Sequence, residues 1–191
     1  MLAQELPHSF WVQADLRQPA AAHRVVDEVV TRAGKIDALV CSAADYGRTP
    51  LVELSDERWA AMLELNLSAP MRLMRAAVAR GATSIVNLVD VAACEPWPNY
   101  LAYSTSKAGL LHLSRCLALE LAPKVRVNCV APGTVLFPDD WSAARRARQV
   151  ERIPLGRSGA PEDVARAVRY LLEEEYLTGV CLPIDGGASL T

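Results

Sequence analysis

Short apolar runs alternate with longer segments of helical periodicity along most of the chain. The apolar runs are too short for helices and are typical of strands buried on both faces. They cover residues 10–15, 36–41, 84–89, 125–130 and 180–185. Between them, apolar residues recur at helical spacing over residues 23–33, 59–80, 101–121 and 161–174. This alternation predicts one α/β domain over residues 1–191, with a parallel sheet covered by helices on both sides.

Local signals predict where several helices begin and end. Ser55 precedes an acidic first turn and is expected to cap a helix N-terminus. Gly34 is expected to end the helix before it, and Pro70 to bend the longest one. Pro161 suits the first turn of the last helix, because proline there loses no hydrogen bond. Residues 138–157 are rich in Arg and Ala and are predicted to be irregular.

Composition and charge exclude several classes of protein. The net charge of −2 gives no electrostatic basis for binding nucleic acid or an anionic membrane surface. No apolar run has the length of a membrane span, and the first residues do not resemble a signal peptide. The five cysteines are scattered and never spaced as Cys-x-x-Cys, which indicates free thiols in a reducing compartment. These features predict a cytoplasmic protein.

Metal chemistry and hydrolase chemistry have no support in the sequence. No His, Cys and carboxylate cluster has the spacing of metal ligands. No Gly-x-Ser-x-Gly elbow is present, and the three histidines lie at a terminus or on predicted helices, away from the strand ends. Neither a metal site nor a histidine-based triad is therefore expected.

Several candidate residues follow directly after predicted strands. They are Asp15, the small residues of 41–44, Asp90, and Pro132 with Gly133. In open parallel sheets, ligands bind beyond the carboxyl ends of the strands. These residues are therefore expected to belong to one site.

Tyr103 and Lys107 are the two residues of the sequence that point most clearly to a shared chemical role. They are four residues apart in a predicted helix, so both side chains leave the same face one turn apart. The positive charge of Lys107 is expected to lower the pKa of Tyr103 and make it a usable general acid. Asp90, thirteen residues earlier, is expected to share the site.

The order of these motifs resembles the short-chain dehydrogenase/reductase family. The matching features are the Tyr103–Lys107 pair, Asn66 within 65–67, and Pro132–Gly133 after a strand. Two segments near the C-terminus, 176–179 and 185–187, also agree. The resemblance implies a Rossmann-like, doubly wound parallel sheet and an NAD(P)-dependent reductase.

The resemblance also assigns roles to single residues at the reacting end. Tyr103 would pass a proton to or from the substrate while hydride moves to or from the nicotinamide. Lys107 would hold the nicotinamide ribose hydroxyls, and Asn66 would hold a water of the proton relay through a local helix distortion. Residues 185–187 would form a turn near the substrate or a subunit contact.

Other positions would bind the cofactor. Asp15 would meet the adenine, and Ser42 and Ala43 would lie beneath the adenosine ribose. Pro132, Gly133 and Thr134 would line the nicotinamide carboxamide.

Position 90 departs from the usual pattern of the family. Most members have Ser there, whereas an Asp resembles the pteridine reductases and the dihydromonapterin/dihydrofolate reductase group. A carboxyl group beside Tyr103 can help to protonate a C=N bond, and a serine hydroxyl mainly donates to a carbonyl oxygen. The expected activity is therefore reduction of a pteridine, with generic ketone or acyl-carrier reduction and loss of activity as the alternatives.

The second departure concerns the family's Gly-rich phosphate-binding loop, which this sequence does not contain. Residues 2–6 look like the end of an interior helix. The expectation is an N-terminally truncated form of a longer protein; the alternative is a short binding or regulatory protein that has lost nucleotide binding. The strand expected at 10–15 would then have no neighbouring strand, and the strand expected at 36–41 would be an unpaired apolar edge of the sheet. NADP is expected only from the pteridine reductase analogy, and NAD is possible.

Further features concern the substrate and the assembly. Trp97 and Trp141 flank the predicted site and are candidates for stacking on a flat heterocyclic substrate. Basic side chains within 145–152 form either a solvated face or an electrostatic rim around an anionic substrate. The family resemblance implies that helices 59–80 and 101–121 pair between copies, which gives a homo-oligomer, a dimer or tetramer.

Overall fold

The computed structural model describes residues 8–191, and the expected helix end at residues 2–6 lies outside this part. Four parallel strands form one sheet in the order β1-β2-β3-β4. Their bounds are Ala38–Cys41 for β1, Ser84–Leu88 for β2, Arg126–Pro132 for β3 and Cys181–Ile184 for β4. The predicted parallel α/β architecture is confirmed.

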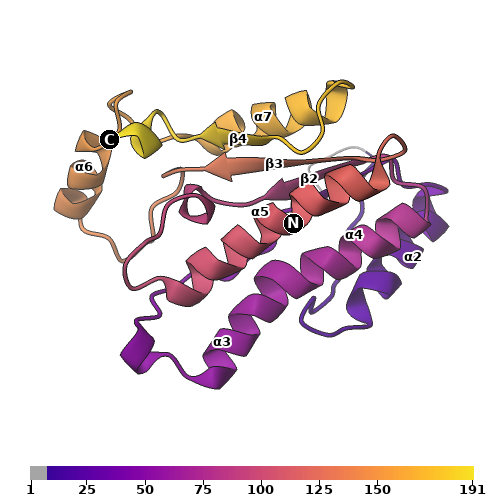
Figure 1. Ribbon diagram of the computed structural model, residues 1–191, viewed down its shortest axis with the longest axis horizontal. Coiled ribbons are helices and arrows are strands. Elements are labelled where there is room, and N and C mark those ends of the chain that lie inside the picture. Colours follow the sequence, from indigo (N-terminus) through magenta and orange to yellow (C-terminus); the bar gives the residue numbers. More distant parts are fainter. Residues whose placement is uncertain (1–7) are drawn as a thin grey trace.

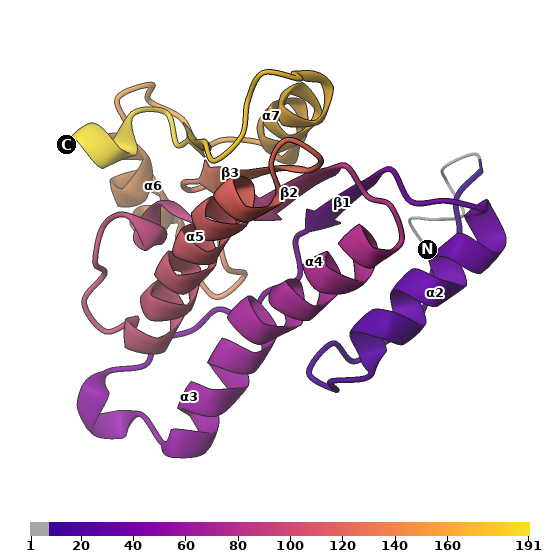
Figure 2. The same cartoon turned by 45° about the vertical axis from the view of Figure 1, so that its right-hand side comes forward.

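Helices cover both faces of the sheet (Figures 1 and 2). The α-helices are α2 (Ala21–Ala33), α3 (Asp56–Leu63), α4 (Ala69–Ala79), α5 (Leu101–Leu121), α6 (Ala143–Glu151) and α7 (Pro161–Glu173). A π-helical turn, η2 (Glu64–Ser68), joins α3 to α4. Short 3-10 turns are η1 (Leu51–Glu53), η3 (Val91–Ala93) and η4 (Ala188–Leu190).

Alternate residues of the central strands supply two separate cores. Ile85 and Val127 are fully buried against α2, α4 and α5 on one face. Val86 and Val130 are fully buried against α7 on the other face. Because successive side chains of a strand point to opposite faces, a continuous apolar run is what a sheet covered on both sides requires.

The predicted helix boundaries are found where the local signals place them. The Ser55 side chain accepts a hydrogen bond from the Arg58 backbone N–H at 3.2 Å and caps α3. Gly34 ends α2 in the left-handed conformation, at φ 81°. Pro70 lies at the start of α4 directly after the π-helical turn, and Pro161 is the first residue of α7.

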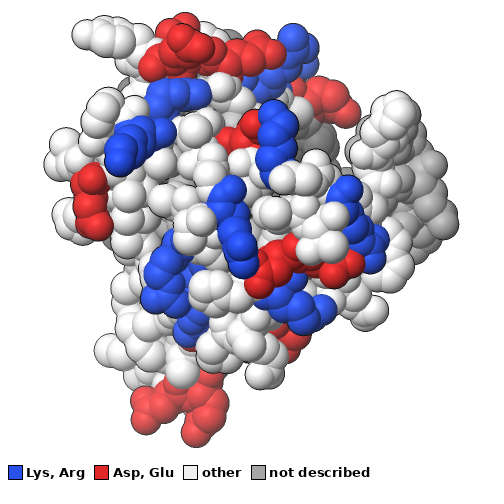
Figure 3. All heavy atoms as spheres, turned by 90° about the vertical axis from the view of Figure 1, so that its right-hand side faces the viewer, with Lys and Arg blue, Asp and Glu red and all other residues white. Residues whose placement is uncertain are grey.

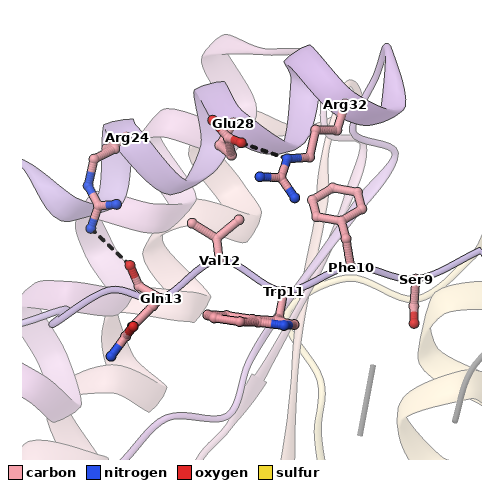
Figure 4. Close-up of a pocket in the computed structure, with 8 residues that line it drawn as sticks. All are labelled: Ser9, Phe10, Trp11, Val12, Gln13, Arg24, Glu28 and Arg32. Carbon is pink, nitrogen blue, oxygen red and sulfur yellow. Dashed lines mark hydrogen bonds and ion pairs between the residues drawn. The ribbon is translucent and has the colours of Figure 1, made fainter. Parts of the chain in front are cut away.

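The prediction of a strand at residues 10–15 is wrong. This segment runs along α2 without pairing to any strand (Figure 4). Its Gln13 carbonyl accepts a hydrogen bond from the Arg24 guanidinium at 3.2 Å, and Arg32 lies over the Phe10 ring at 5.1 Å. A cavity of about 650 Å³ lies between the segment and the helix. A strand needs a ladder partner for its backbone groups, and the described residues offer this segment none.

The prediction of an irregular segment at 138–157 is also wrong in part, because α6 lies within it. Ser142 caps this helix by accepting a hydrogen bond from the Arg145 N–H at 3.3 Å. Alanine and arginine are strong helix formers, and Ala143, Ala147 and Val150 recur at helical spacing. The segment therefore carries a short helical pattern that the prediction did not use, although the helix buries no residue.

The face of the molecule seen in Figure 3 has no concentration of charge of one sign. Acidic and basic side chains are interspersed on the face seen in Figure 3. None of the helices within residues 8–191 combines the length and the apolarity that a membrane crossing needs. Over the same residues, no group of three or more His, Cys, Asp or Glu side chains is placed to hold a metal ion.

Candidate active site

Asp90 lies just beyond the carboxyl end of β2 and uses its two carboxylate oxygens differently. One oxygen, Oδ1, accepts a hydrogen bond from the Ala92 N–H at 2.8 Å and caps η3. The other, Oδ2, accepts a hydrogen bond from the Tyr103 hydroxyl at 2.7 Å. The predicted meeting of Asp90 and Tyr103 is confirmed, and the first turn of η3 fixes the carboxylate for it.

Tyr103 and Lys107 lie one turn apart on α5, and both are almost fully buried. The Lys107 ammonium donates a hydrogen bond to the Leu88 carbonyl at 2.8 Å and lies 5.9 Å from the centre of the Tyr103 ring. Leu88 at the end of β2 thus binds the Lys107 ammonium, and Asp90, two positions later, binds the Tyr103 hydroxyl.

The electrostatics of this pair differ from the prediction. Burial raises the pKa of Tyr103, and the charge of Asp90 raises it further. Burial lowers the pKa of Lys107 to about 8. The expected lowering of the Tyr103 pKa by Lys107 is not found, because burial raises the pKa most and the Asp90 carboxylate contacts the hydroxyl directly, while the ammonium is turned to Leu88. Burial also raises the pKa of Asp90, against its two hydrogen bonds and the charge of Lys107.

Asn66 lies in the π-helical turn, fully buried, and its amide is occupied by protein groups. Its Oδ1 accepts from the Asp45 N–H at 2.7 Å, and its Nδ2 donates to the Asp45 carbonyl at 2.8 Å and to the Ser106 Oγ at 3.0 Å. The helix distortion implied by the family resemblance is present. In this state Asn66 joins the loop after β1 to α5, and its role in holding a water stays a prediction.

Tyr46, which the sequence analysis did not single out, forms part of the site. The Asp45 carboxylate before it accepts hydrogen bonds from the Arg58 guanidinium at 2.5 and 3.2 Å, which keep the pKa of Asp45 low. Tyr46 then packs edge-on against Tyr103, with ring centres 4.9 Å apart, and stacks on Tyr100 at 5.2 Å. The only sequence signal for it was an aromatic residue in the loop that follows a strand end.

These residues form one wall of a cavity of about 680 Å³. Tyr103 and Asp90 lie at this wall, and Tyr46, Trp97 and Trp141 contribute aromatic surface. Trp97 also lies close to Tyr103, with ring centres 6.5 Å apart. Both tryptophans singled out in the sequence thus line the candidate site.

The segment after β3 contributes a further wall. Gly133 and Thr134 line the cavity, and the Thr134 hydroxyl accepts a hydrogen bond from Gln149 of α6 at 3.1 Å. A Cβ atom at Gly133 would lie 2.7 Å from the Asp185 Cβ, so only glycine fits there. Asp185 accepts hydrogen bonds from the Gly187 and Ser189 N–H groups and forms a turn, as the sequence analysis expected.

Five predicted cofactor-binding residues do not line this cavity. Lys107 is buried one turn after Tyr103 on α5, Pro132 is the last residue of β3, and the other three lie in other parts of the fold. Asp15 is exposed and accepts a hydrogen bond from the Arg17 N–H at 3.1 Å. Ser42 and Ala43 are exposed beyond the end of β1. The structure does not bring Asp15, Ser42 and Ala43 to Tyr103, and their role toward an adenosine group stays a prediction.

The residues present fit one half of a nicotinamide dinucleotide, which supplies or accepts a hydride when bound. Lys107 uses one described acceptor for its three N–H donors, so it retains donors for ribose hydroxyls near Tyr103. Gly133 and Thr134 lie at the adjacent wall. Within residues 8–191, no glycine-rich turn leads from a strand into a helix, which is the feature that holds a pyrophosphate.

Comparison with known proteins identifies the family. Residues 1–189 match the profile of a family described as enoyl-(acyl carrier protein) reductase. A granaticin polyketide synthase putative ketoacyl reductase from Streptomyces violaceoruber is 36% identical over 98% of this chain and 80% of its own length. The 3-oxoacyl-[acyl-carrier-protein] reductase FabG from Thermotoga maritima is 37% identical over 85% of this chain and 70% of its own length.

Solved structures agree with these relatives. The aldohexose dehydrogenase of Thermoplasma acidophilum superposes with a TM-score of 0.90 at 27% identity, over 97% of this chain and 80% of the other. A short-chain dehydrogenase/reductase from Brucella melitensis gives 0.88 at 30% identity, over 93% and 75% of the two chains. The chain belongs to the short-chain dehydrogenase/reductase family.

Proposed function

We propose that this NAD(P)-dependent short-chain reductase reduces the carbonyl group of a small-molecule substrate. The observation that carries the proposal is the Tyr103 hydroxyl, which lies in a hydrogen bond with Asp90 and one helical turn from Lys107 at the wall of the cavity. The ketoacyl reductase and FabG relatives support a carbonyl substrate, since their names describe reduction of oxoacyl groups.

In this proposal the proton comes from the buried pair of Tyr103 and Asp90. Tyr103 donates its hydroxyl proton to the substrate oxygen. Asp90, whose pKa is raised by burial, then returns a proton to the phenolate when it is in its acid form. Lys107 stabilises the negative charge that appears on the tyrosine, since its ammonium lies 5.9 Å from the ring centre.

Reduction of a pteridine C=N bond is the second candidate function. Two observations favour it: an Asp, which can itself donate a proton, contacts the Tyr103 hydroxyl, and aromatic side chains line the cavity. A flat heterocycle would stack on those rings. The relatives named above point to oxoacyl substrates, so the carbonyl alternative is supported better than the pteridine expected from the sequence.

Oxidation of NADPH and of NADH, followed at a fixed chain concentration, separates these candidates. The substrates to compare are acetoacetyl-CoA, a simple ketone, dihydrobiopterin and dihydrofolate. We expect turnover of the oxoacyl compound or the ketone. Turnover of the pterins alone would replace the carbonyl proposal by the second candidate, and the ratio of the two cofactors would decide between NADP and NAD.

A non-catalytic binding role predicts a different result. In that case the chain would fold cooperatively, bind neither dinucleotide in a calorimetric titration, and turn over none of the four substrates. If a chain extended upstream by a glycine-rich loop were active while this chain was inactive, the expectation of a truncated reductase would be supported instead.

We also propose that the enzyme is a homo-oligomer. The proposal follows the family resemblance, which implies that α4 and α5 pair between copies. Two leucines of α5, Leu101 at 40% and Leu119 at 84%, are exposed and available for such a contact. A molar mass measured by light scattering tests this, and a monomeric mass at micromolar concentration would contradict it.

A further inference from the structure

Two arginines, Arg145 on α6 and Arg152 directly after its last residue, line the same cavity as Tyr103. Arg145 and Arg152 both border it, whereas Arg148, on the same exposed helix, does not. Gln149 lies on the cavity side of α6 as well and is occupied by its hydrogen bond to Thr134. Two exposed arginine residues, one on α6 and one at its C-terminal cap, therefore border the substrate space.

Arg145 is held in place by an aromatic ring and not by a carboxylate within residues 8–191. Its guanidinium lies over the Trp141 ring at 3.9 Å, which is a close cation–π contact. The turn beneath it is fixed by Arg146, which donates hydrogen bonds to the Trp141 carbonyl at 3.0 Å and to the Pro138 carbonyl at 3.1 Å. Stacking restricts the Arg145 side chain and leaves the edge of the guanidinium free to donate.

Neither arginine is neutralised by a carboxylate within the described part of the chain. Arg58, Arg72 and Arg169 each have an acidic partner within ion-pair distance, whereas other arginines, Arg148 among them, have none within residues 8–191. Arg145 and Arg152 have none among residues 8–191, so their positive charges face the cavity.

Two acidic side chains also line the cavity. They are Asp90, which is engaged by Tyr103 and Ala92, and Glu95. Burial, Tyr100 and Asp90 raise the pKa of Tyr46, while the charge of Arg145 opposes that rise. The charge of Arg145 therefore reaches the ring that packs against Tyr103.

We infer that the cavity selects a substrate with an anionic group, a carboxylate or a phosphate, bound by Arg145 and Arg152 while its carbonyl lies at Tyr103. This inference rests on the proposed reductase function and names its substrate class. Arginine suits the role because its planar fork matches both anions with paired hydrogen bonds. An uncharged ketone or pterin would leave both guanidinium groups without an acceptor.

Pairs of ketones that differ only in charge test this inference. Acetoacetate is compared with methyl acetoacetate for the carboxylate, and dihydroxyacetone phosphate with dihydroxyacetone for the phosphate. In the unaltered chain we expect the anionic member of at least one pair to have the lower KM, and that KM to rise with salt. The pair that responds identifies the anion. Equal KM values within both pairs would overturn the inference.

Substitutions on α6 provide the matched control. We expect Arg145→Gln and Arg152→Gln each to raise KM for the anionic ketone roughly tenfold or more, with the neutral ketone changed less than about twofold. Arg148→Gln should change neither, and Arg145→Lys should recover part of the loss, which also controls for folding. An equal rise for both ketones would contradict an anion-binding role.

Calorimetric titration of the chain with acetoacetate and with dihydroxyacetone phosphate separates this inference from the proposed function. Binding that Arg145→Gln abolishes, without turnover of any ketone, would support the anion site and contradict the reductase proposal. Turnover with equal KM values for the charged and the uncharged ketones would support the reductase proposal and contradict the anion site. A lower KM seen only for substrates attached to a carrier protein would also overturn the inference. The charge recognised would then belong to the carrier protein and would bind outside the cavity.

Discussion

The two side chains that define the chemistry, Tyr103 and Asp90, are joined by a buried hydrogen bond. The hydroxyl donates to the carboxylate at 2.7 Å, and burial raises the pKa of both groups. A serine at position 90 would donate to a substrate oxygen but would not supply a second titratable group. Asp90 therefore makes both the activity and the stability of the chain depend on pH in a way that a serine would not.

The pH dependence of stability has a definite sign at Asp90. Its pKa is higher in the folded state than in the unfolded state, because burial disfavours the charged form. The folded state is thus favoured at low pH, where the group is protonated in both states, and this advantage is lost as the pH rises through the folded-state pKa. We expect Asp90→Asn to raise the melting temperature more at pH 8 than at pH 4.

Thermal unfolding followed by circular dichroism at the two pH values measures this difference. Asp37→Asn is a suitable control, because Asp37 has an exposed side chain paired with Lys35 outside the site. A stabilisation by Asp90→Asn that is the same at both pH values would contradict the raised pKa.

At the scale of elements, the π-helical turn between α3 and α4 organises the site. It places Asn66 where its amide satisfies both backbone groups of Asp45, and Arg58 of α3 holds the Asp45 carboxylate. The loop after β1 therefore keeps Tyr46 against Tyr103. One irregular turn in a long helix links β1, α3 and α5 at the reacting end of the molecule.

Asn66→Ala is expected to destabilise the fold by about 2–4 kcal/mol, since it leaves buried polar groups without partners. Its expected effect on activity is a loss of kcat, because Tyr46 is no longer held beside Tyr103. The measurement is chemical denaturation together with the steady-state rate. Arg75→Ala on α4 is the control, as Arg75 is exposed and is expected to change stability by less than about 0.5 kcal/mol.

At the scale of the whole molecule, helices cover both faces of the sheet, and among residues 8–191 its two edge strands, β1 and β4, each pair on one side only. Within the described residues β1 pairs only with β2, and Val40 on β1 is 40% exposed. The segment 8–15 lies along α2 instead of covering this edge (Figure 2). Unpaired backbone groups beside apolar side chains favour association between chains.

Val40→Lys is expected to reduce aggregation, because a charge on an edge strand opposes strand pairing between copies. Light scattering against protein concentration measures the effect. Leu119→Lys, which removes an exposed apolar residue from α5, is the comparison that distinguishes association through the edge strand from association through the helices. Aggregation that is unchanged by Val40→Lys would show that the edge of β1 is not responsible.

Most of the fold was predictable from the sequence because its central strands are apolar on both faces. Residues 84–89 and 125–130 read as buried strands for the same reason that they form two cores. The strand expected at 10–15 was not found, because an apolar run does not reveal whether a pairing partner is present. Helix α6 was missed because it is short and exposed, and its few apolar positions at helical spacing are outnumbered by charged and polar residues.

The residues of the site that belong to recognisable motifs were predictable from the sequence. Tyr103, Lys107, Asp90 and Asn66 meet in one region, as strand ends and helical spacing indicated. The direction of the Tyr103 pKa shift was not predictable, since it depends on which charge contacts the hydroxyl. That contact is set by the η3 turn, which the sequence did not reveal.

The central claim is that Tyr103 supplies the proton in an NAD(P)H-dependent carbonyl reduction. The most direct test is the rate of NADPH or NADH oxidation with the preferred ketone, in the unaltered chain and in Tyr103→Phe. We predict that the substitution lowers kcat by roughly 10²- to 10⁴-fold, the range typical of a lost general acid, while the melting temperature stays close to that of the unaltered chain. A Tyr103→Phe chain that reduces the ketone at an unchanged rate would contradict the account.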